Sequence, residues 1–574
     1  MFSQFYDSMG KFTISVMDTR WVLTEIEQVG IDLPALPKPI KSVLLSRGIC
    51  SSADLEQFLN PPHKLPYDPL RLSGMDQALR RIYSASKQNQ IVGVFGDFDV
   101  DGITGTSIIK EGLEAFGISV VTYIPDRVSE GHGLSNAAIH YFERQGVLLL
   151  ITVDCGVTSI EEVSYARQLG IDVIITDHHV PGDSIPAASA IINSQMEDSS
   201  YPYPYLCGAG IAFKLIQGLY QLVGQPWPIK LLELAALGTI ADLVPLTDEN
   251  RYIVSHGLDG LSNTERPGLL ALYKHAKVNA SLLTSETVSY QISPRLNSSG
   301  RMANAGISLD LLTTDSYEEA DKLAVQLESL NNQRRTLSSK SYDTALKEIE
   351  REDILRKVLF VTSPIFTTGV TGLVAGKLAE DFHRPAIALA ETSVPNLLVA
   401  SARSVPTFDM ISALKHCETL LEKFGGHAQA AGFTVRRDNL AELTTRINEL
   451  ASNLVFEDRY EKIVSVDAEV RLADLDQRFV DWLKRLEPWG IGNPQPVFMS
   501  LRVEVVDFRY MGNEGQHIKF TVKQEDSLWV ALAFNQGFKW SEGIQYWDIA
   551  FTIAEDSWRD GDACLKLVDF RPSF

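Results

Sequence analysis

Cysteine is scarce in this chain, and its few copies are scattered along the whole length. No two of them form the C-x-x-C pair of zinc ribbons and dithiol redox sites. Their odd number also argues against a disulfide framework. We therefore expect neither structural zinc nor disulfides, and we interpret the cysteines as small apolar fillers. They are Cys50, Cys155, Cys207, Cys417 and Cys564.

Long apolar runs are also missing. No stretch reaches the roughly 20 apolar residues that a membrane-spanning helix needs. The segment from Met1 to Trp21 lacks the basic start and apolar core of a signal peptide. These absences lead us to expect a cytoplasmic protein with no membrane partner.

Positive charge is the third deficit. The chain has 52 Lys and Arg against 73 Asp and Glu, a formal net charge of −21. Such an excess of negative charge argues against nucleic acid as a partner, but net charge reports only the average field, and an acidic protein can carry a local basic groove. The charge therefore lowers this hypothesis without excluding it. At 574 residues, the length predicts roughly three or four domains.

Carboxylates are abundant where a hydrophobic run at 91–96 ends. Asp97, Asp99 and Asp101 follow this run directly. The run predicts a buried strand, and in an open α/β sheet ligands lie at the carboxyl end of such strands. Three carboxylates so close repel one another unless a cation such as Mg²⁺ or Mn²⁺ lies between them. Considered alone, the segment is equally well explained as a polar loop.

Two later apolar runs end in the same way. The run at 147–153 ends at Asp154, and the run at 173–176 ends at Asp177, His178 and His179. Each has a simpler explanation, since an Asp can cap a helix and histidines can lie in a loop. Strands alternating with helix-length segments, however, predict a parallel sheet covered on both faces. Its strand ends meet at one edge.

A helical stretch at 231–240 adds another carboxylate, Asp242, at its end. The expected cluster contains six groups that suit two cations roughly 3.5–4 Å apart, an arrangement that activates water and stabilises a phosphoryl displacement. The predicted ligands are Asp97, Asp99, Asp101, Asp154, His178 and Asp242.

Four stretches carry a specific resemblance: Gly96–Gly105, Val153–Gly156, Asp177–His179 and Ala241–Pro245. They are similar to the signature motifs of the DHH phosphoesterase superfamily. From about residue 40 to beyond 510, the chain resembles the bacterial RecJ single-stranded-DNA exonucleases.

The resemblance implies two ions, Mn²⁺ or Mg²⁺, that share Asp154 as a bridging ligand. Asp97 and Asp99 complete one site, and the other is completed by Asp101, His178 and Asp242. By the same resemblance, Asp177 orients the neighbouring histidine and His179 faces the scissile phosphate.

Further residues acquire a substrate role from the resemblance alone. Arg127 would meet phosphate, and His132, which stands where the family usually has Tyr, would stack on a base. A basic, glycine-containing loop at 293–302 would act as a phosphate clamp. Its contact residues would be Arg295, Asn297 and Arg301.

The second lobe adds contacts of the same kind. Ser401 and Arg403 would bind a terminal phosphate, and His427 the scissile or adjacent one. The chain departs from the family at Phe366 and Thr367, where Trp-His is usual, so the contribution of that histidine is missing.

The expected fold class is α/β: a parallel-sheet DHH domain, joined by a long helix to a smaller α/β DHH-associated domain, plus a C-terminal OB-like β-barrel. Such a barrel binds single strands, although it could instead merely buttress the other lobes. The expected domains are an N-terminal packing extension at 1–85, the DHH domain at 86–315, the connecting helix at 316–353, the DHH-associated domain at 354–456 and the barrel at 457–574.

The resemblance implies a single-stranded-DNA-specific 5′-to-3′ exonuclease that releases 5′-mononucleotides in DNA repair and recombination. It implies a monomer, with a helicase and a single-stranded-DNA-binding protein as candidate partners. One alternative is a DHH phosphodiesterase for short oligonucleotides or cyclic dinucleotides, which needs neither the extension nor the barrel. Another is an inactive replication scaffold, which would have lost the ligands that this chain retains.

Overall fold

The computed structural model describes residues 19–24, 33–34, 36–60, 65–127, 129–351, 356–452, 462–512, 515–555 and 563–573. These residues form two compact units. The sheet unit comprises the described residues of 61–454 together with 488–493, and the barrel unit comprises those of 1–60, 455–487 and 494–574. None of the described helices combines the length and the apolar character needed to cross a membrane.

The sheet unit is built on five parallel strands in the order β3-β2-β4-β5-β6. Burial on both faces explains why the central strands are almost continuously apolar. The strands are β2 (Ile91–Gly96), β3 (Val120–Tyr123), β4 (Val147–Val153), β5 (Asp172–Thr176) and β6 (Ala190–Ile192).

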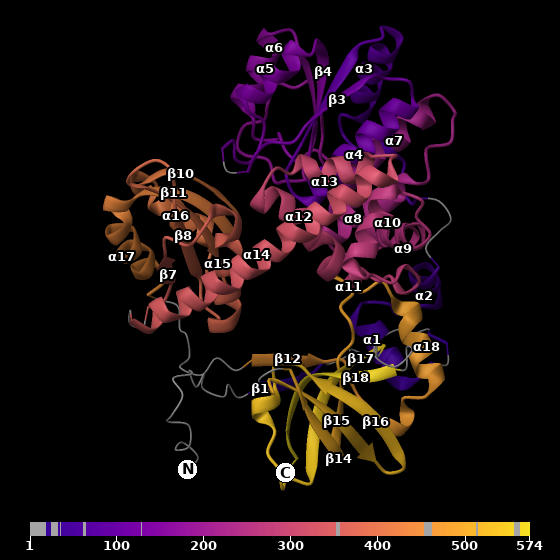
Figure 1. Ribbon diagram of the computed structural model, residues 1–574. Coiled ribbons are helices and arrows are strands. Elements are labelled where there is room, and N and C mark those ends of the chain that lie inside the picture. Colours follow the sequence, from indigo (N-terminus) through magenta and orange to yellow (C-terminus); the bar gives the residue numbers. More distant parts are fainter. Residues whose placement is uncertain are drawn as a thin grey trace. The chain divides into compact units, whose positions relative to one another are not determined.

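Helices cover both faces of this sheet (Figure 1). Val92 and Val94 of β2 point to one face and Phe95 to the other, as the alternation of a strand requires. The first face packs against α3 (Met75–Lys87), α4 (Val100–Ala115) and α7 (Gly208–Leu222), and the second against α5 (Asn136–Arg144) and α6 (Ile160–Gln168).

After β6 the chain forms a group of helices. Its main members are α8 (Leu231–Ala241), α9 (Asp248–Ser262), α10 (Pro267–Ala276), α12 (Ser293–Met302) and α13 (Gly306–Thr313). The predicted loop at 293–302 is wrong, because these residues form α12. Ser298 and Ser299 are buried there, and each hydroxyl donates to a carbonyl of its own helix, at Arg295 and Leu296. Packing therefore overrides the weak helix preference of serine and glycine.

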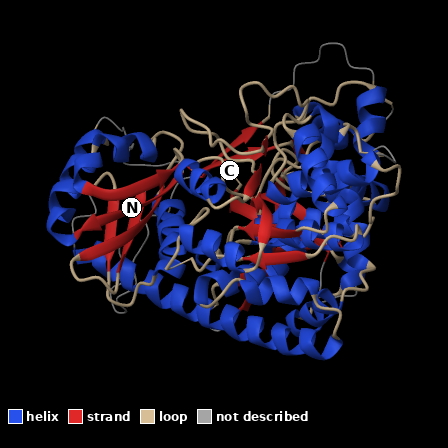
Figure 2. Ribbon diagram, turned by 90° about the horizontal axis from the view of Figure 1, so that it is seen from above, coloured by secondary structure: helices blue, strands red, loops and turns tan. Residues whose placement is uncertain are grey.

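The long helix α14 (Tyr317–Arg351) leads to a second sheet, as Figure 1 shows. Alternate residues of its strand β8 face two separate cores, one formed with α14 and α15 (Thr368–Phe382) and the other with α16 (Met410–His416) and α17 (Leu440–Leu450). Figure 2 shows these helices in blue against the red strands. In spatial order the strands are β10 (Leu421–Gly426), β11 (Ala430–Arg436), β9 (Leu397–Arg403), β8 (Ala386–Glu391) and β7 (Leu359–Thr362).

The barrel unit contains the predicted β-barrel. Strand β14 pairs with both β15 and β17, which closes a ring of five strands through a parallel β16–β18 pair. The ring consists of β14 (Phe498–Met511), β15 (His517–Gln524), β16 (Ser527–Ala533), β17 (Tyr546–Glu555) and β18 (Ala563–Pro572).

Segments from near both ends of the chain complete the barrel unit. Strand β1 (Thr19–Leu23) pairs in parallel with β12 (Lys462–Val466), and Trp21 donates to the carboxylate of Asp569 at 2.7 Å. The remaining elements are the short strand β13 (Ala468–Glu469) and the helices α1 (Lys38–Ser46), α2 (Ser52–Leu59) and α18 (Gln477–Leu486). The fold class expected from the sequence is confirmed.

Candidate metal centre

The strand order reverses between β2 and β4. The chain passes from β2 to its neighbour β3 on one side and then returns to β4 on the other. In sheets of this kind, the crevice at the carboxyl ends of the two strands flanking the reversal binds ligands. Asp97 directly follows β2 and Asp154 directly follows β4, so both lie at this point.

Backbone N–H groups position the carboxylates of Asp99 and Asp101. Asp99 caps the N-terminus of α4, where its Oδ1 accepts from the backbone N–H of Asp101 at 2.9 Å and of Gly102 at 3.1 Å. The Asp101 carboxylate accepts from the N–H groups of Gly208 at 2.6 Å and Ala209 at 2.8 Å. These amides begin α7, where unpaired N–H groups favour negative charge.

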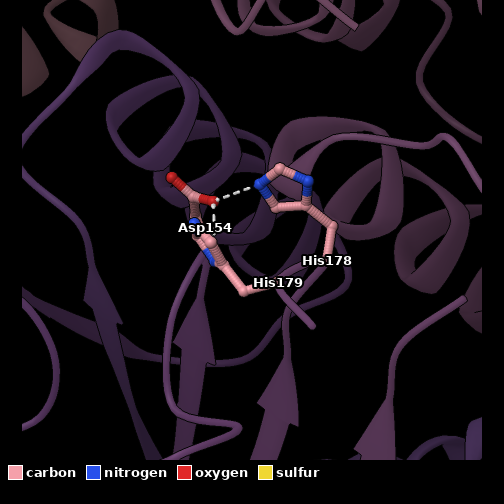
Figure 3. Close-up of side chains that lie close together, drawn as sticks. All are labelled: Asp154, His178 and His179. Carbon is pink, nitrogen blue, oxygen red and sulfur yellow. Dashed lines mark ion pairs between the residues drawn. The ribbon is translucent and has the colours of Figure 1, made fainter. Parts of the chain in front are cut away.

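Asp154 lies against both His178 and His179 (Figure 3). Its backbone has φ 61°, a strained left-handed conformation that is typical of functional positions. Oδ1 lies 3.0 Å from His178 Nε2 and 4.0 Å from His179 Nδ1. This atom is buried and yet accepts no hydrogen bond of good geometry from the described residues. A buried oxygen in this state is suited to a cation.

The two histidines are held by different partners. His178 Nε2 faces carboxylates, at 3.8 Å from Asp101 Oδ2 and 3.7 Å from Asp242 Oδ2. The ring of His179 instead donates from Nδ1 to Asp177 Oδ1 at 2.7 Å. Asp177 also accepts from the backbone N–H groups of His178 and His179, at 2.8 and 3.1 Å. The histidine that Asp177 orients is therefore His179.

Crowding of like charges perturbs the pKa values in this cluster. Burial, followed by the charges of Asp97 and Asp101, raises the pKa of Asp99 to about 6. Burial and then Asp101 and Asp99 raise the pKa of Asp242 to about 9, and that of Asp154 is also well above its ordinary value. Burial lowers the pKa of His178, which keeps its ring neutral and able to bind a metal.

The donor atoms fall into three overlapping groups, within each of which all ligand atoms lie within 4.8 Å of one another. They are Asp97 with Asp99 and Asp154, Asp101 with His178 and Asp242, and Asp154 with His178 and His179. Carboxylate oxygens with one or two imidazole nitrogens suit Mn²⁺ or Mg²⁺. The six ligands expected from the sequence are all brought together, and they fit such an ion.

Three arginines lie near one another, and the charges of two of them, Arg127 and Arg301, interact with the carboxylate of Asp99. The Arg127 guanidinium lies 4.7 Å from the centre of the Phe98 ring, and Arg301 donates to the carbonyl of Gly369 at 3.2 Å. Burial, and next the charge of Arg127, lowers the pKa of both Arg301 and Arg403, that of Arg301 to about 9. Guanidinium groups that lower one another's pKa form an anion site that suits a phosphate.

His132 joins the carboxylate cluster. It donates from Nδ1 to Asp97 Oδ1 at 2.9 Å, and its ring packs edge-on against Phe98 and His179, with centroids 6.3 and 5.6 Å apart. Against the lowering effect of burial, the hydrogen bond to Asp97 raises the pKa of His132 to about 9.

The second sheet contributes His427 and the pair Ser401 and Arg403. The ring of His427 lies parallel to that of His179, with centroids 6.4 Å apart. Ser401 Oγ lies 3.0 Å from Thr371 Oγ1, and a Cβ at Gly372 would meet both Ser401 and Arg403. The two residues expected to bind a terminal phosphate therefore lie next to each other. Thr367, where the family histidine is missing, is exposed just before α15.

Two of the expected substrate residues form hydrogen bonds within the protein. Asn297 Oδ1 accepts from the backbone N–H of Val100 at 3.2 Å and so supports the start of α4. Arg295 donates to Glu328 of α14 and to the carbonyl of Gln291, both at 2.6 Å. Through these contacts, Asn297 supports the start of α4 and Arg295 joins α12 to α14.

Sequence reasoning missed Phe98 and Gly208. Phe98, between the first two carboxylates, supports Arg127 and His132 with its ring. Gly208 leaves room for the cluster, because a Cβ there would lie 2.5 Å from Asp154 Cβ. The run of small residues that starts α7, Gly208 to Gly210, was the available signal.

Comparison with known proteins agrees with this geometry. Three family models match: the DHH family N-terminal domain at 91–239, the DHHA1 domain at 356–453 and the RecJ OB domain at 466–566. A crystal structure of RecJ in complex with Mn²⁺ from Thermus thermophilus superposes with a TM-score of 0.81 at 28% identity, over 96% of this chain and 79% of that one. A Mg²⁺ complex from the same organism gives 0.75 at 26% identity, over 96% and 78%.

Curated relatives are similar along most of the chain. The single-stranded-DNA-specific exonuclease RecJ of Escherichia coli is 33% identical over 94% of this chain and 96% of its own length. That of Bacillus subtilis is 36% identical over 88% of this chain, a match that spans 64% of the Bacillus protein. With three matching domains and nearly full-length coverage of the Escherichia coli relative, the chain belongs to the RecJ family of single-stranded-DNA-specific exonucleases.

Proposed function

We propose that this protein degrades single-stranded DNA from the 5′ end and releases 5′-mononucleotides, using two divalent cations, in DNA repair and recombination. The observation that carries the proposal is the position of Arg127 and Arg301 beside six buried or half-buried metal-ligand side chains, with Arg403 close to these two arginines. One part of the site suits cations, and the other suits the phosphates of the strand.

Asp154 supports the two-ion arrangement because it belongs both to the group with Asp97 and Asp99 and to a group with His178. We assign Asp97, Asp99 and Asp154 to one ion, and Asp101, Asp154, His178 and Asp242 to the other. Mn²⁺ or Mg²⁺ bound there supplies an activated water and charge stabilisation for phosphoryl transfer. Two solved relatives, named as complexes with Mn²⁺ and with Mg²⁺, support this choice of ions.

The protein's own residues orient the strand. Arg127, Arg301 and Arg403 would hold phosphate oxygens, and Ser401, next to Arg403, would donate to the terminal phosphate. His179 would contact the scissile phosphate through Nε2, because its Nδ1 is bound to Asp177. His427, parallel to His179, would contact the same or the adjacent phosphate.

Phosphate contacts position a strand without reading its bases, so the activity should show little sequence preference. Release of a 5′-mononucleotide requires the bond to the 3′ oxygen of the terminal nucleotide to break. Binding of the 5′-terminal phosphate by Ser401 and Arg403 would place that bond one nucleotide inward. The 5′-to-3′ direction is proposed from the resemblance to the RecJ exonucleases, and the pairing of a terminal-phosphate site with the metal cluster is compatible with it.

The barrel supplies a surface for the remaining strand. A groove of about 480 Å³ on β14, β15 and β16 is lined by Arg509, Lys519 and Trp529, among other residues. Basic and aromatic side chains together bind single strands through phosphate contacts and base stacking. This groove supports a binding role for the barrel in preference to simple buttressing.

The experiment is cleavage of 5′- and 3′-labelled single-stranded DNA with Mn²⁺ or Mg²⁺, beside Asp154→Ala and with a dinucleotide competitor. Wild type should release the 5′ label at once as mononucleotide, and the 3′ label should stay on long products. The variant and a chelator control should be inactive. An inert long strand with rapid hydrolysis of dinucleotides or cyclic dinucleotides would contradict the proposal in favour of a small-substrate phosphodiesterase. Absence of any hydrolysis would favour a scaffold.

A further inference from the structure

Six residues, 488–493, which we call the strap, belong to the sheet unit although the chain on both sides of them belongs to the barrel unit. The strap is a tight turn. Gly490 and Asn493 exchange two backbone hydrogen bonds, of 2.9 and 3.0 Å. The buried side chain of Asn493 donates to the carbonyl of Pro488 at 2.8 Å. The turn is therefore a defined structure that can act as one body.

The strap packs against the loop 242–247. The backbone N–H of Leu246 donates to the carbonyl of Ile491 at 2.7 Å. A Cβ at Gly490 would lie 2.6 Å from the Leu246 side chain, and one at Gly492 would lie 2.9 Å from the Thr247 methyl carbon. Glycine allows this close approach of two backbones. A further bond fastens the strap, since Ser285 Oγ donates to the Trp489 carbonyl at 2.6 Å.

The contacted loop begins with Asp242. Tyr203 and Asn250 donate to the carbonyl of Pro245, at 2.8 and 3.0 Å. The loop is thus held by these two side chains as well as by the strap. It also contains Leu243 in a left-handed conformation, φ 60°, which needs such support.

Asp242 is the ligand most in need of this support. Its side chain is 24% exposed, against 5%, 1% and 4% for Asp97, Asp101 and Asp154. Asp101 is fixed by two helix amides, whereas Asp242 lies at the end of α8 where the loop starts. We infer that the strap is a positioning element that holds Asp242 at the metal centre, so that the lead-in to the barrel contributes to metal affinity.

This inference rests on the proposed role of Asp242 as a metal ligand. It is tested in the full-length protein with Gly492→Ala, which places a methyl group against Thr247. The matched control is Gly170→Ala. Both glycines have φ 77°, but nothing lies within 4 Å of a Cβ at Gly170. Both substitutions therefore add the same backbone strain, and only one presses on the loop.

Three quantities are measured: Mn²⁺ affinity by calorimetry, hydrogen exchange of 242–247 in the metal-free protein, and cleavage against Mn²⁺ concentration. Gly492→Ala should weaken Mn²⁺ binding by about tenfold, in the range found for residues that orient ligands. It should also speed hydrogen exchange in the loop 242–247. Saturating Mn²⁺ should restore the cleavage rate to that of the wild type. Ser285→Ala, which removes one anchor of the strap, should show the same pattern to a smaller extent.

Both glycine substitutions should lower the melting temperature, because both add backbone strain. Gly170→Ala should change neither the Mn²⁺ affinity nor the hydrogen exchange of the loop 242–247. Equal Mn²⁺ affinity and equal loop exchange in the two glycine variants and Ser285→Ala would overturn the inference. Asp242→Asn distinguishes failure of the inference about the strap from failure of the proposed ligand role of Asp242. If it weakens Mn²⁺ binding while the strap variants do not, only the inference fails. If it leaves Mn²⁺ affinity unchanged, the ligand role of Asp242 fails, and the inference fails with it.

Discussion

Asp177 holds the ring of His179 through a 2.7 Å hydrogen bond from Nδ1, while the ring of the adjacent His178 faces Asp154 at 3.0 Å. Under the proposed function the two neighbouring histidines have separate tasks, one toward the cations and one toward the substrate. The division can be tested because each ring has its own carboxylate.

Asp177→Asn should lower the cleavage rate by roughly 10- to 100-fold, because the charge that raises the pKa of His179 is lost. Mn²⁺ affinity should stay within about twofold, since Asp177 is not among the proposed ligands. The variant should also unfold at lower temperature. The two carboxylate oxygens of Asp177 accept from the backbone N–H groups of Val157 and His179, whereas an amide has only one accepting oxygen and leaves one of these N–H groups without its partner. Kinetics and Mn²⁺ calorimetry check this, and a large loss of Mn²⁺ affinity would contradict the division.

Asp154→Asn should stabilise the metal-free protein while abolishing activity. Burial and the charges of Asp101, Asp99 and Asp97 raise the pKa of Asp154, so its ionised form is costly without a cation. Asn tolerates the left-handed backbone at this position. In chelator the melting temperature should rise by roughly 2–6 °C, and Mn²⁺ should no longer raise it as in wild type. The exposed Asp183→Asn is the control, and a lower melting temperature in chelator would contradict the prediction.

Metal stabilisation should increase with pH. In the folded protein the pKa of Asp99 is about 6 and that of Asp242 about 9, both above their unfolded values. Groups with raised pKa values stabilise the fold below the unfolded pKa, and this contribution is lost as pH rises through the folded pKa. The metal-free protein should therefore lose stability from about pH 4 to pH 9.

A bound cation replaces these protons, so the rise in melting temperature caused by Mn²⁺ should be roughly 5 °C larger at pH 8 than at pH 6. Thermal scans in chelator and in Mn²⁺ at both pH values provide the measurement. An effect of Mn²⁺ that is independent of pH would show that binding releases no protons from the cluster.

Arg509 and Lys519 are direct cross-strand partners on β14 and β15, and both line the groove of the barrel. Like charges placed opposite each other destabilise a sheet, which a bound phosphate backbone would relieve. Arg509→Gln should leave the melting temperature unchanged or slightly higher and should weaken binding of long single strands several-fold. The slope of log affinity against log salt should decrease by about 0.7.

Arg478→Gln, which removes an exposed cation from α18 outside the groove, is the matched control and should leave both quantities unchanged. Fluorescence anisotropy with a labelled strand at several salt concentrations measures them. Equal salt slopes for the two variants would place the strand elsewhere on the protein.

The ligand cluster was largely predictable because it depends on local pattern. Asp97, Asp154 and Asp177 each end an apolar run, and parallel strands present their carboxyl ends at one edge whatever the details of packing. The long connecting helix and the barrel were expected as well, and they correspond to α14 and to the ring of β14 to β18.

Other features depend on contacts between residues far apart in the chain, which no local pattern encodes. Residues 293–302 suggested a loop but form α12, because burial of Ser298 and Ser299 outweighs their weak preference for helix. The ion pair of Arg295 with Glu328, on another helix, is a contact of this kind.

The chemistry of the metal centre was therefore predictable from the residues at the strand ends, because residue type and position along a strand determine it. The residues that support the centre were not predictable, because they act through packing between distant segments. Asp242 is a predictable carboxylate at a helix end, but the strap that packs on its loop lies more than 200 positions further along the chain. Only the folded chain brings the two together, since hydrogen bonds and close backbone contacts depend on distance in space and leave no periodic trace in the sequence.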